Sequence, residues 1–184
     1  MTLDQLFECW RREVSNKKNP GSRISLISNV LKRARKDNKL RYLFNFRLAQ
    51  YLYGKGGVWR RHARGMQQRL NRRYAIDIDL NAVIGPGFRI AHLPGVVISG
   101  HARIGRNCFI RQNTTIGIKT LGLEHYELSI GDNVSIGANS CIVADRLTIG
   151  DNATIGAMSL VNKCVPANCV FYNKRVVSQQ FSQN

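Results

Sequence analysis

The sequence predicts a mainly β fold, a three-sided prism of short stacked strands that follows a basic α-helical segment. One observation is an aliphatic residue that returns every sixth position between about residues 78 and 166. Another is a small residue four positions after most of these, and a third is the excess of Lys and Arg before residue 76. A period of six fits neither a helix of about 3.6 residues per turn nor an alternating strand, whereas one hexad per face fits a prism.

The hexad series is long and has only three interruptions. Nine of its twelve steps are six residues long, and the exceptions are steps of eight after Ile90, fourteen after Ile116 and seven after Ile142. The aliphatic residues should point inward and the small residues should lie at crowded corners, while Gly and Asn supply positive φ in the turns. A β-sandwich would instead show turns about every 8–12 residues. The recurring residues are Ile78, Ile84, Ile90, Ile98, Ile104, Ile110, Ile116, Ile130, Ile136, Ile142, Ile149, Ile155 and Val161.

The segment before the repeats has the periodicity of four helices. Apolar residues recur at helical spacing, Ser22 can cap one helix, and a cluster of glycines ends another. The expected spans are residues 1 to about 20 (ending near Asn19–Pro20), Ser22 through Leu31, about 40–53 and about 58–73.

The net charge of +17 belongs to this helical segment. Residues 1–75 hold 19 Lys and Arg against 4 Asp and Glu, a net of +15, whereas residues 76–184 hold 9 against 7, a net of +2. Basic helix faces are often simply solvated, but they also attract anionic partners. A membrane surface or a phosphate-bearing acceptor is favoured over nucleic acid, because no nucleic-acid recognition motif accompanies the charges.

Composition narrows the class of protein further. No apolar run reaches the roughly 18–20 residues of a membrane span, and the N-terminus has no signal-peptide core. The five cysteines are odd in number and lack C-x-x-C spacing, and Cys108 falls on a small-residue position, which predicts a buried thiol. We therefore expect a cytoplasmic protein.

The interruptions divide the repeat region. The fourteen-residue step requires a protruding loop at 118–128, and polar loops on rigid scaffolds commonly carry function. The seven-residue step indicates a bulge around Asp145–Arg146. The predicted organisation is a basic helical segment (1–75), a repeat domain (76–170) and a C-terminal tail (171–184).

The best candidate for chemistry is His92, which stands where a step stretches to eight residues. An imidazole can take a proton from a hydroxyl near neutral pH, and a carboxylate on its other nitrogen would orient it. Asp77 precedes His92 by fifteen residues, close to one coil of eighteen, so the two side chains can approach between neighbouring coils or across a subunit seam. A locally hydrogen-bonded surface histidine is the alternative. We predict no metal site, because the histidines lack zinc-ligand spacing.

The stretch I-D-I-D-L-N-A-V-I-G-P-G-F-R-I-A-H-L-P-G-V-V-I-S-G resembles the hexapeptide-repeat acyltransferases, most of all serine O-acetyltransferase and its polysaccharide-modifying relatives. The resemblance covers about residues 76–177. It implies a left-handed parallel β-helix, normally a homotrimer, in which acetyl-CoA and acceptor meet in the groove between subunits. The family's catalytic aspartate falls on Asp77 and its general-base histidine on His92, and the stretched step has the same length.

The resemblance also implies further site residues. The coils I-G-A-N-S and I-G-A-M-S-L-V-N-K-C-V-P look like those that line the CoA groove, and the ending F-Y-N-K-R-V-V is similar to the family's G-N-P-A-R-V. The implied contacts are Gly117, Ala138, Ala157, Asn162, Lys163 and Arg175 for acetyl-CoA, and Arg111, His125 and Tyr126 for the acceptor.

Two departures bear on the acceptor. The serine enzymes carry an aspartate before the catalytic histidine, where this chain has Ala91, and an Arg-His pair in the loop, where it has Tyr126 and Glu127. The basic helical N-terminus looks more like capsule or exopolysaccharide acetyltransferases. The expected function is therefore acetyl-CoA-dependent O-acetylation of a sugar hydroxyl in polysaccharide biosynthesis. The alternatives are a serine O-acetyltransferase of cysteine biosynthesis and a non-catalytic trimeric scaffold that binds anionic membrane or nucleic acid.

A homotrimer is expected on physical grounds as well. A prism of about four coils is short, and three prisms side by side bury their flanks in a closed ring. The helices before the prism either mediate further association or cap the first coil, and the sequence leaves both open.

Overall fold

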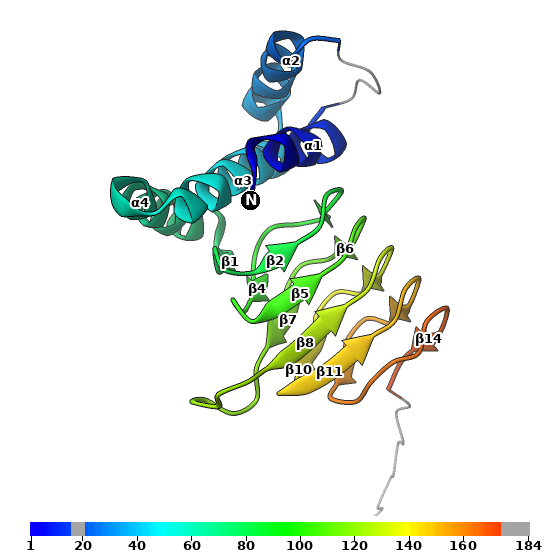
Figure 1. Cartoon of the computed structure of the whole chain (residues 1–184). Coiled ribbons are helices and arrows are strands. Elements are labelled where there is room, and N and C mark those ends of the chain that lie inside the picture. Colours follow the sequence, from blue (N-terminus) through cyan, green and yellow to red (C-terminus); the bar gives the residue numbers. More distant parts are fainter. Residues whose placement is uncertain (16–20, 174–184) are drawn as a thin grey trace, which may run out of the picture.

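In the computed structural model, residues 1–15 and 21–173 are described, and they form helices above one end of a three-sided prism of strands (Figure 1). Side-chain hydrogen bonds cap the N-termini of three helices. Thr2 forms a capping box with Gln5, and Ser22 accepts a hydrogen bond from the Ser25 N–H. Asp37 accepts hydrogen bonds from two N–H groups of the next turn. The helices are α1 (Leu3–Glu13), α2 (Arg23–Lys36), α3 (Asn38–Lys55) and α4 (Gly57–Tyr74).

The predicted helices are all present, with different ends. The helix α1 ends at Glu13, short of the expected Asn19–Pro20, and positions 16–20 lie outside the described residues. The helices α3 and α4 are longer than expected and meet at Gly56, whose φ of 78° ends one helix and starts the next. No helix in the described part of the chain is long and apolar enough to cross a membrane.

The prism consists of three parallel sheets, and each strand pairs with the strand one coil away. The strands of sheet A are β1 (Asp77–Ile78), β4 (Val97–Ile98), β7 (Thr115–Gly117), β10 (Cys141–Val143) and β13 (Leu160–Val161). Sheet B holds β2 (Val83–Ile84), β5 (Ala102–Ile104), β8 (Glu127–Ile130) and β11 (Arg146–Ile149). Sheet C holds β3 (Arg89–Ile90), β6 (Phe109–Ile110), β9 (Ser135–Ile136), β12 (Thr154–Ile155) and β14 (Val170–Phe171).

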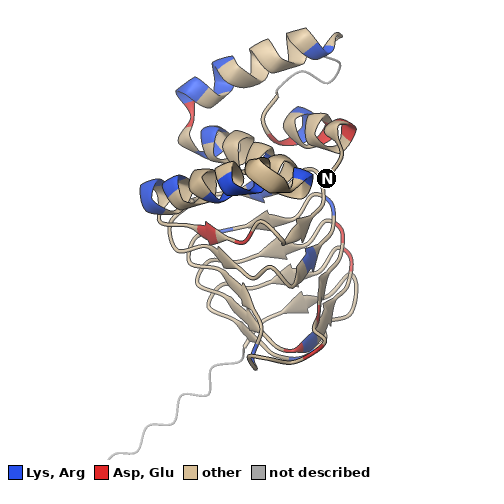
Figure 2. Ribbon diagram, turned by 60° about the vertical axis from the view of Figure 1, so that its left-hand side comes forward, with Lys and Arg blue, Asp and Glu red and all other residues tan. Residues whose placement is uncertain are grey.

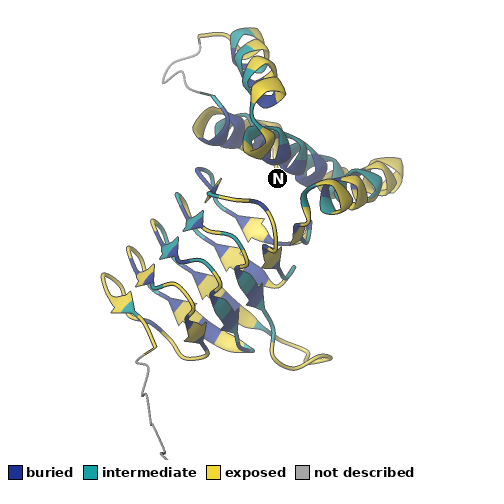
Figure 3. Ribbon diagram, turned by 180° about the vertical axis from the view of Figure 1, so that it is seen from behind, coloured by how far each residue is buried: buried dark blue, intermediate teal, exposed yellow. Residues whose placement is uncertain are grey.

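The chain visits sheets A, B and C in turn, which confirms one hexad per face. Sheets A and C each contain five strands, so the prism has five coils and not the four or so expected. Figure 3 shows buried and exposed residues alternating along every face. Phe171 still belongs to β14, and positions 174–184 of the predicted tail lie outside the described residues.

The interior of the prism follows the hexad pattern. The recurring aliphatic residues are buried, and the small residues four positions later are buried beside them. One of these is Cys108, and its burial raises the pKa of the thiol to about 12. The predicted buried thiol is therefore confirmed.

Asparagines make the corners possible. Six of them have φ between 54° and 59°, a left-handed conformation that Asn tolerates better than most residues. The amide of Asn107 donates to Asn133, Asn133 donates to Asn152, and Asn152 donates to Asn168, at 2.9–3.1 Å. At another corner Met158 takes the equivalent place with φ of 57°. Corner turns are thus built from backbone conformation and stacked amides.

The helices cap the first coil of the prism through a buried ion pair. Arg47 is fully buried, and its guanidinium donates to both carboxylate oxygens of Glu13 at 2.6 and 2.9 Å. It also donates to the carbonyls of Ile84 and Gly85 at 2.9 Å, while Glu13 accepts from the Phe88 N–H at 3.1 Å. Because these groups belong to both regions, the division into separate domains at residue 75 stays a prediction.

The protruding loop is shorter than expected. The strand β8 begins at Glu127, and the side chain of Leu128 is buried, so the loop that follows Gly117 ends at Tyr126 and not at residue 128. The alternation of exposed and buried residues along β8 resumes two positions early, which returns the chain to the prism.

Candidate active site

The stretched hexad step creates an irregular turn between sheets C and A. Ile90 pairs with Ile110 in sheet C. Ile98 pairs with Ile116 in sheet A. A step of eight residues therefore lies opposite a step of six, and two surplus residues must leave the stack at this corner.

His92 and Leu93 are the surplus residues. The carbonyl of Pro94 accepts from the Asn113 N–H at 3.1 Å, so the stack of coils resumes at Pro94. The side chain of Leu93 is buried in the prism, whereas His92 is exposed. The insertion thus places the His92 imidazole outside the prism, and the buried side chain of Leu93 holds the turn against the prism.

Asp77 lies at the same corner on the adjoining coil. Its N–H donates to the carbonyl of Val96 at 2.8 Å, which places the start of β1 beside the turn that carries His92. Its carboxylate accepts from the side-chain amide of Asn71, in the last turn of α4, at 2.8 Å. Within residues 1–15 and 21–173, no hydrogen bond joins the Asp77 carboxylate to the His92 imidazole. Asp77 therefore lies on the strand beside the turn of His92, and its carboxylate is bonded to Asn71.

Ala138 and Ala157 lie two and three coils below His92 on this corner. We call it the C–A corner, and it consists of residues 91–96, 111–114, 137–140 and 156–159. The Met158 N–H donates to the Ala138 carbonyl at 2.8 Å, and a Cβ added to Gly137 would meet the Ala157 nitrogen at 2.4 Å. Only glycine fits this spacing, so the coils of Ala138 and Ala157 approach each other closely, with the exposed side chain of Met158 beside them.

Arg111 lies one coil below His92, also on the C–A corner. It follows β6, is exposed, and its guanidinium lies 4.8 Å from the centre of the Phe109 ring. This cation–π contact fixes the charge outside the prism, beside the line of residues that runs from His92 to Ala157.

A second corner, on the other side of sheet A, holds further candidates. We call it the A–B corner, and it consists of residues 79–82, 99–101, 118–126, 144–145 and 162–164. Gly117 ends β7 at this corner, and Asn162 and Lys163 are exposed two coils lower, after β13. Arg175 lies outside the described residues.

The protruding loop is held to the A–B corner by Asp145. The Asp145 carboxylate accepts from the Lys119 N–H at 3.0 Å and from the Thr120 N–H at 2.8 Å. These hydrogen bonds lower the pKa of the Asp145 carboxyl, the contacts with Thr120 being the main cause. Sequence reasoning predicted only a bulge at Asp145 and missed its contact with the loop, although the seven-residue step marks this position.

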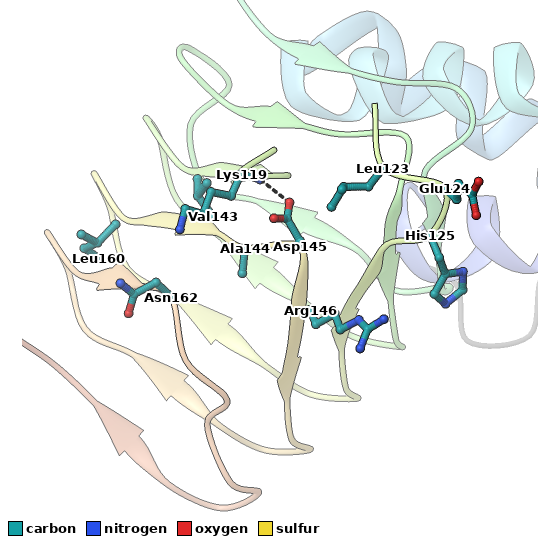
Figure 4. A pocket seen from close by; sticks show the side chains of 10 residues that line it. All are labelled: Lys119, Leu123, Glu124, His125, Val143, Ala144, Asp145, Arg146, Leu160 and Asn162. Atoms are coloured by element: carbon teal, nitrogen blue, oxygen red, sulfur yellow. Dashed lines mark hydrogen bonds between the residues drawn. The ribbon is translucent and has the colours of Figure 1, made fainter. Parts of the chain in front are cut away.

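A hollow of about 960 Å³ lies beneath this loop (Figure 4). His125, one of the predicted acceptor residues, lines it, and so does Asn162. Tyr126 does not line it: its hydroxyl donates to the Thr120 carbonyl, and its ring lies 4.3 Å from that of His101. The lining residues are Lys119, Leu123, Glu124, His125, Val143, Ala144, Asp145, Arg146, Leu160 and Asn162.

The predicted site residues therefore fall into two groups within one chain. His92, Arg111 and the two alanines share the C–A corner, with Asp77 beside them, whereas the remaining described candidates share the A–B corner. The outward side chains of sheet A lie between the groups and include Val97, which is 41% exposed, and Leu160, which is 51% exposed. Sequence reasoning missed this partly apolar strip, although its residues precede the inward aliphatics in every coil.

No metal site is formed by the part of the chain that the structure describes. Among residues 1–15 and 21–173, no three His, Cys, Asp or Glu side chains are grouped so as to hold an ion. His92 itself presents an exposed imidazole at the C–A corner.

Part of the prism is similar in sequence to known proteins. A family model described as a hexapeptide repeat of succinyl-transferase matches residues 127–161. Serine acetyltransferase 1, chloroplastic, from Arabidopsis thaliana is 43% identical over 82 residues, which are 44% of this chain and 26% of that protein. Probable serine acetyltransferase 5 from Oryza sativa subsp. japonica is 38% identical over 85 residues. The matched region spans about a quarter of these curated relatives.

Solved structures extend the likeness to nearly the whole chain. Serine acetyltransferase isoform 3 from Entamoeba histolytica, in complex with cysteine, covers 98% of this chain and 61% of its own, with a TM-score of 0.71 and 25% identity. The soybean serine acetyltransferase apoenzyme covers 95% of this chain and 68% of its own, with a TM-score of 0.69 and 28% identity. The fold is a left-handed parallel β-helix of hexapeptide repeats, and it resembles that of serine acetyltransferases.

The prediction of a polysaccharide acceptor is wrong by these comparisons, because the relatives and the similar structures are serine acetyltransferases. The prediction relied on Ala91, on the loop residues and on the basic helices before the prism. The Entamoeba structure superposes on 98% of the chain, which includes those helices, so a helical front segment does not separate this chain from the serine enzymes. The alternative acceptor, serine, is the better supported one. The location in the cytoplasm stays a prediction, since two plant relatives are named as chloroplastic and mitochondrial proteins.

Proposed function

We propose that this chain is an acetyl-CoA-dependent O-acetyltransferase whose acceptor is the hydroxyl of serine. The observation that carries the proposal is the two-residue insertion that puts His92 outside the prism, beside the strand of Asp77. The likeness to serine acetyltransferases in sequence and fold supports the same activity. An exposed imidazole beside a carboxylate, with no metal ligand set among the described residues, suits general-base catalysis.

In the proposed reaction, His92 takes the proton from the serine hydroxyl as its oxygen attacks the thioester carbonyl of acetyl-CoA. A C–O bond forms, the C–S bond breaks, and the thiolate of CoA takes the proton back from the imidazolium. Asp77 would accept from the other ring N–H of His92 and stabilise its charged form, after turning from Asn71. Backbone N–H groups would stabilise the tetrahedral oxyanion, each worth about 3–4 kcal/mol in other acyl transfers.

The backbone-lined part of the C–A corner is the proposed place for the arm of acetyl-CoA. Ala138 and Ala157 lie there in line with His92, and their small side chains leave backbone groups accessible. Gly117, Asn162, Lys163 and Arg175 would contact the same molecule from the A–B corner of a neighbouring chain. A homotrimer would bring the two corners together, because within one chain sheet A separates them.

For the acceptor, the proposal assigns Arg111 and His125. Arg111 can pair with a carboxylate from its place below His92, and His125 lines the hollow under the loop. Tyr126 would act indirectly, because its hydroxyl holds the loop conformation by accepting from the Leu123 N–H at 2.9 Å.

The first test is the release of CoA from acetyl-CoA with L-serine, in the wild type and in His92→Ala. We expect the variant to be at least about 100- to 1,000-fold slower with its circular dichroism unchanged. His62→Ala, another exposed histidine far from the insertion, is the matched control and should keep its rate. Near-normal turnover in His92→Ala would reject the catalytic assignment, and a chain that binds no acetyl-CoA by calorimetry would be a scaffold.

The second test addresses the acceptor through Ala91. A carboxylate beside His92 can accept a charge-assisted hydrogen bond from the ammonium group of serine, which is worth about tenfold in binding. Ala91→Asp should therefore lower the KM for L-serine about tenfold with kcat nearly unchanged. If the wild type releases CoA with other hydroxyl compounds but not with L-serine, the acceptor is wrong while the transferase remains.

A further inference from the structure

The helix α4 carries an excess of positive charge that neither the prism nor the candidate active site uses. Its eighteen residues include six arginines and no Asp or Glu. Its buried side, with Ala63 and Leu70, faces the rest of the protein. Arg61, Arg69 and Arg72 lie on the opposite side, because helix positions eight and eleven residues apart share one side of a helix. Figure 2 shows how Lys and Arg gather on the helices above a prism with few charges.

These charges are not neutralised by the chain itself. Within residues 1–15 and 21–173, the ion pairs belong to α1, α2, α3 and the protruding loop, and none includes an arginine of α4. Arg60 and Arg64 lie 4.7 and 5.9 Å from the centre of the Tyr53 ring, an arrangement that keeps their charge. A surface of this kind attracts anions.

Apolar side chains project beside these charges at the turn between α3 and α4. Val58 is 70% exposed and Trp59 is 55% exposed. They follow Gly56 and are flanked by Lys55 and Arg60. Tryptophan next to Lys and Arg is typical of segments that lie in the interface between a bilayer and water. A single-stranded nucleic acid would stack on Trp59 but not on Val58, which has no π face and is the more exposed of the two.

The turn is also placed where a flat surface can reach it. In Figures 1 and 3 the paired helices α3 and α4 extend beyond the outline of the prism. A surface that contacts the turn and the outer side of α4 would therefore leave the candidate active site open.

We propose that the α3–α4 turn and the outer side of α4 dock on a membrane surface that carries anionic headgroups. Val58, which shares the side of α4 with Arg61, Arg69 and Arg72, enters the headgroup region, and these arginines pair with the phosphates. Each Lys or Arg near such a surface strengthens binding about fivefold. The interaction is independent of the proposed acetyl transfer and serves to hold the chain at the surface.

The test measures cosedimentation of the full-length chain with vesicles of phosphatidylcholine, with and without phosphatidylglycerol. We expect binding only to the anionic vesicles, weakened by added salt. Arg61→Gln, Arg69→Gln and Arg72→Gln together should weaken binding about 100-fold, from three factors of about five. Val58→Ala should weaken it severalfold at high salt, where the apolar contact dominates, and should weaken it more than Trp59→Ala, whose position shares the side of Leu70.

The matched control removes three arginines from the prism. Arg89→Gln, Arg103→Gln and Arg106→Gln change the net charge equally, and these residues are exposed. Equal loss of vesicle binding in this control, or no binding by the wild type, would overturn the proposal. Tighter binding of a DNA oligonucleotide than of anionic vesicles, lost in the α4 variant, would overturn it in favour of nucleic acid. Unchanged turnover with L-serine in the α4 variant would separate this result from the fate of the proposed activity.

Discussion

The helices and the prism solve the problem of burial in different ways. The prism repeats one solution five times, since each coil places an aliphatic residue inside and a small residue at the corner and contacts only its neighbours. The helices use a single arrangement, which buries aromatic rings such as Trp10, Tyr42 and Phe46 together with one Glu13–Arg47 ion pair. We therefore expect the effect of a substitution in the prism to stay local, whereas a substitution of the ion pair in the helical cap should cause a large loss of stability.

The largest effect is expected at the cap. Arg47→Met leaves the Glu13 carboxylate buried without its partner and should lower the free energy of unfolding by about 3–5 kcal/mol, measured by urea denaturation. Arg12→Met, which removes a partly exposed pair with Glu8, should cost less than about 1 kcal/mol. Adding Glu13→Leu to Arg47→Met should restore only part of the loss, because the Phe88 N–H still lacks an acceptor. Equal costs for the two arginine variants would contradict the special role of the cap.

In the prism, one deleted aliphatic side chain should cost less than the ion pair. Ile136 is fully buried, and Ile136→Ala should lower the free energy of unfolding by about 3 kcal/mol. Thr154→Ala, on the next strand of the same sheet but exposed, should change it by less than about 0.5 kcal/mol. Amide exchange should accelerate mainly in the coils next to Ile136. Acceleration across all coils and helices would show that the prism is not built from independent neighbours.

A smaller effect, of opposite sign, is expected at the C–A corner. Met158 has φ of 57°. The equivalent position in the coil above is Asn139, whose side chain accepts a hydrogen bond from Asn113. Met158→Asn should raise the free energy of unfolding by about 1 kcal/mol, because Asn tolerates this conformation at lower cost. The reverse change, Asn152→Met, should lower it by more than this amount, because it also removes the side-chain hydrogen bonds with Asn133 and Asn168. A loss of stability in Met158→Asn would mean that the contacts of the methionine outweigh its backbone strain.

The smallest effect concerns the loop and its dependence on pH. The pKa of Asp145 is lower in the folded chain than its ordinary value, so its hold on the loop is present above that ordinary value and is lost as pH falls through the lowered pKa. The amide proton shifts of Lys119 and Thr120 should follow this titration in NMR spectra. Asp145→Asn should abolish it while the prism stays folded. Shifts that do not change between neutral and acidic pH would remove the carboxylate from this role.

Sequence predicts regular features better than unique ones in this chain. The six-residue period predicts the positions of the inward aliphatic residues, the corner asparagines and the displaced His92, because a hexad allows one register on each face. No repeat pattern predicts the Glu13–Arg47 ion pair, since the two residues are far apart in sequence and neither belongs to a repeat. The same holds for Asp145 and the loop.

The candidate site was only partly predictable for a related reason. His92 lies where the six-residue repeat is interrupted, and the interruption identifies it. Arg111, Gly117 and the other predicted contacts lie within regular hexads, so the sequence pattern does not distinguish them from their neighbours. Their roles came from resemblance, and the structure places them on two corners of one chain. The acceptor was mispredicted because three local differences, including Ala91, counted for more than a likeness that extends over the whole fold.

The regular spacing of the stacked coils also fixes the distances along the prism. Neighbouring strands are about 4.8 Å apart, so the distance from His92 to any lower coil can change only in whole steps of that size. An eighteen-residue insertion or deletion in the coils below His92 would lengthen or shorten the C–A corner by one step while leaving the imidazole in place. The length of the C–A corner is therefore set by the number of coils and does not depend on the side chains around His92.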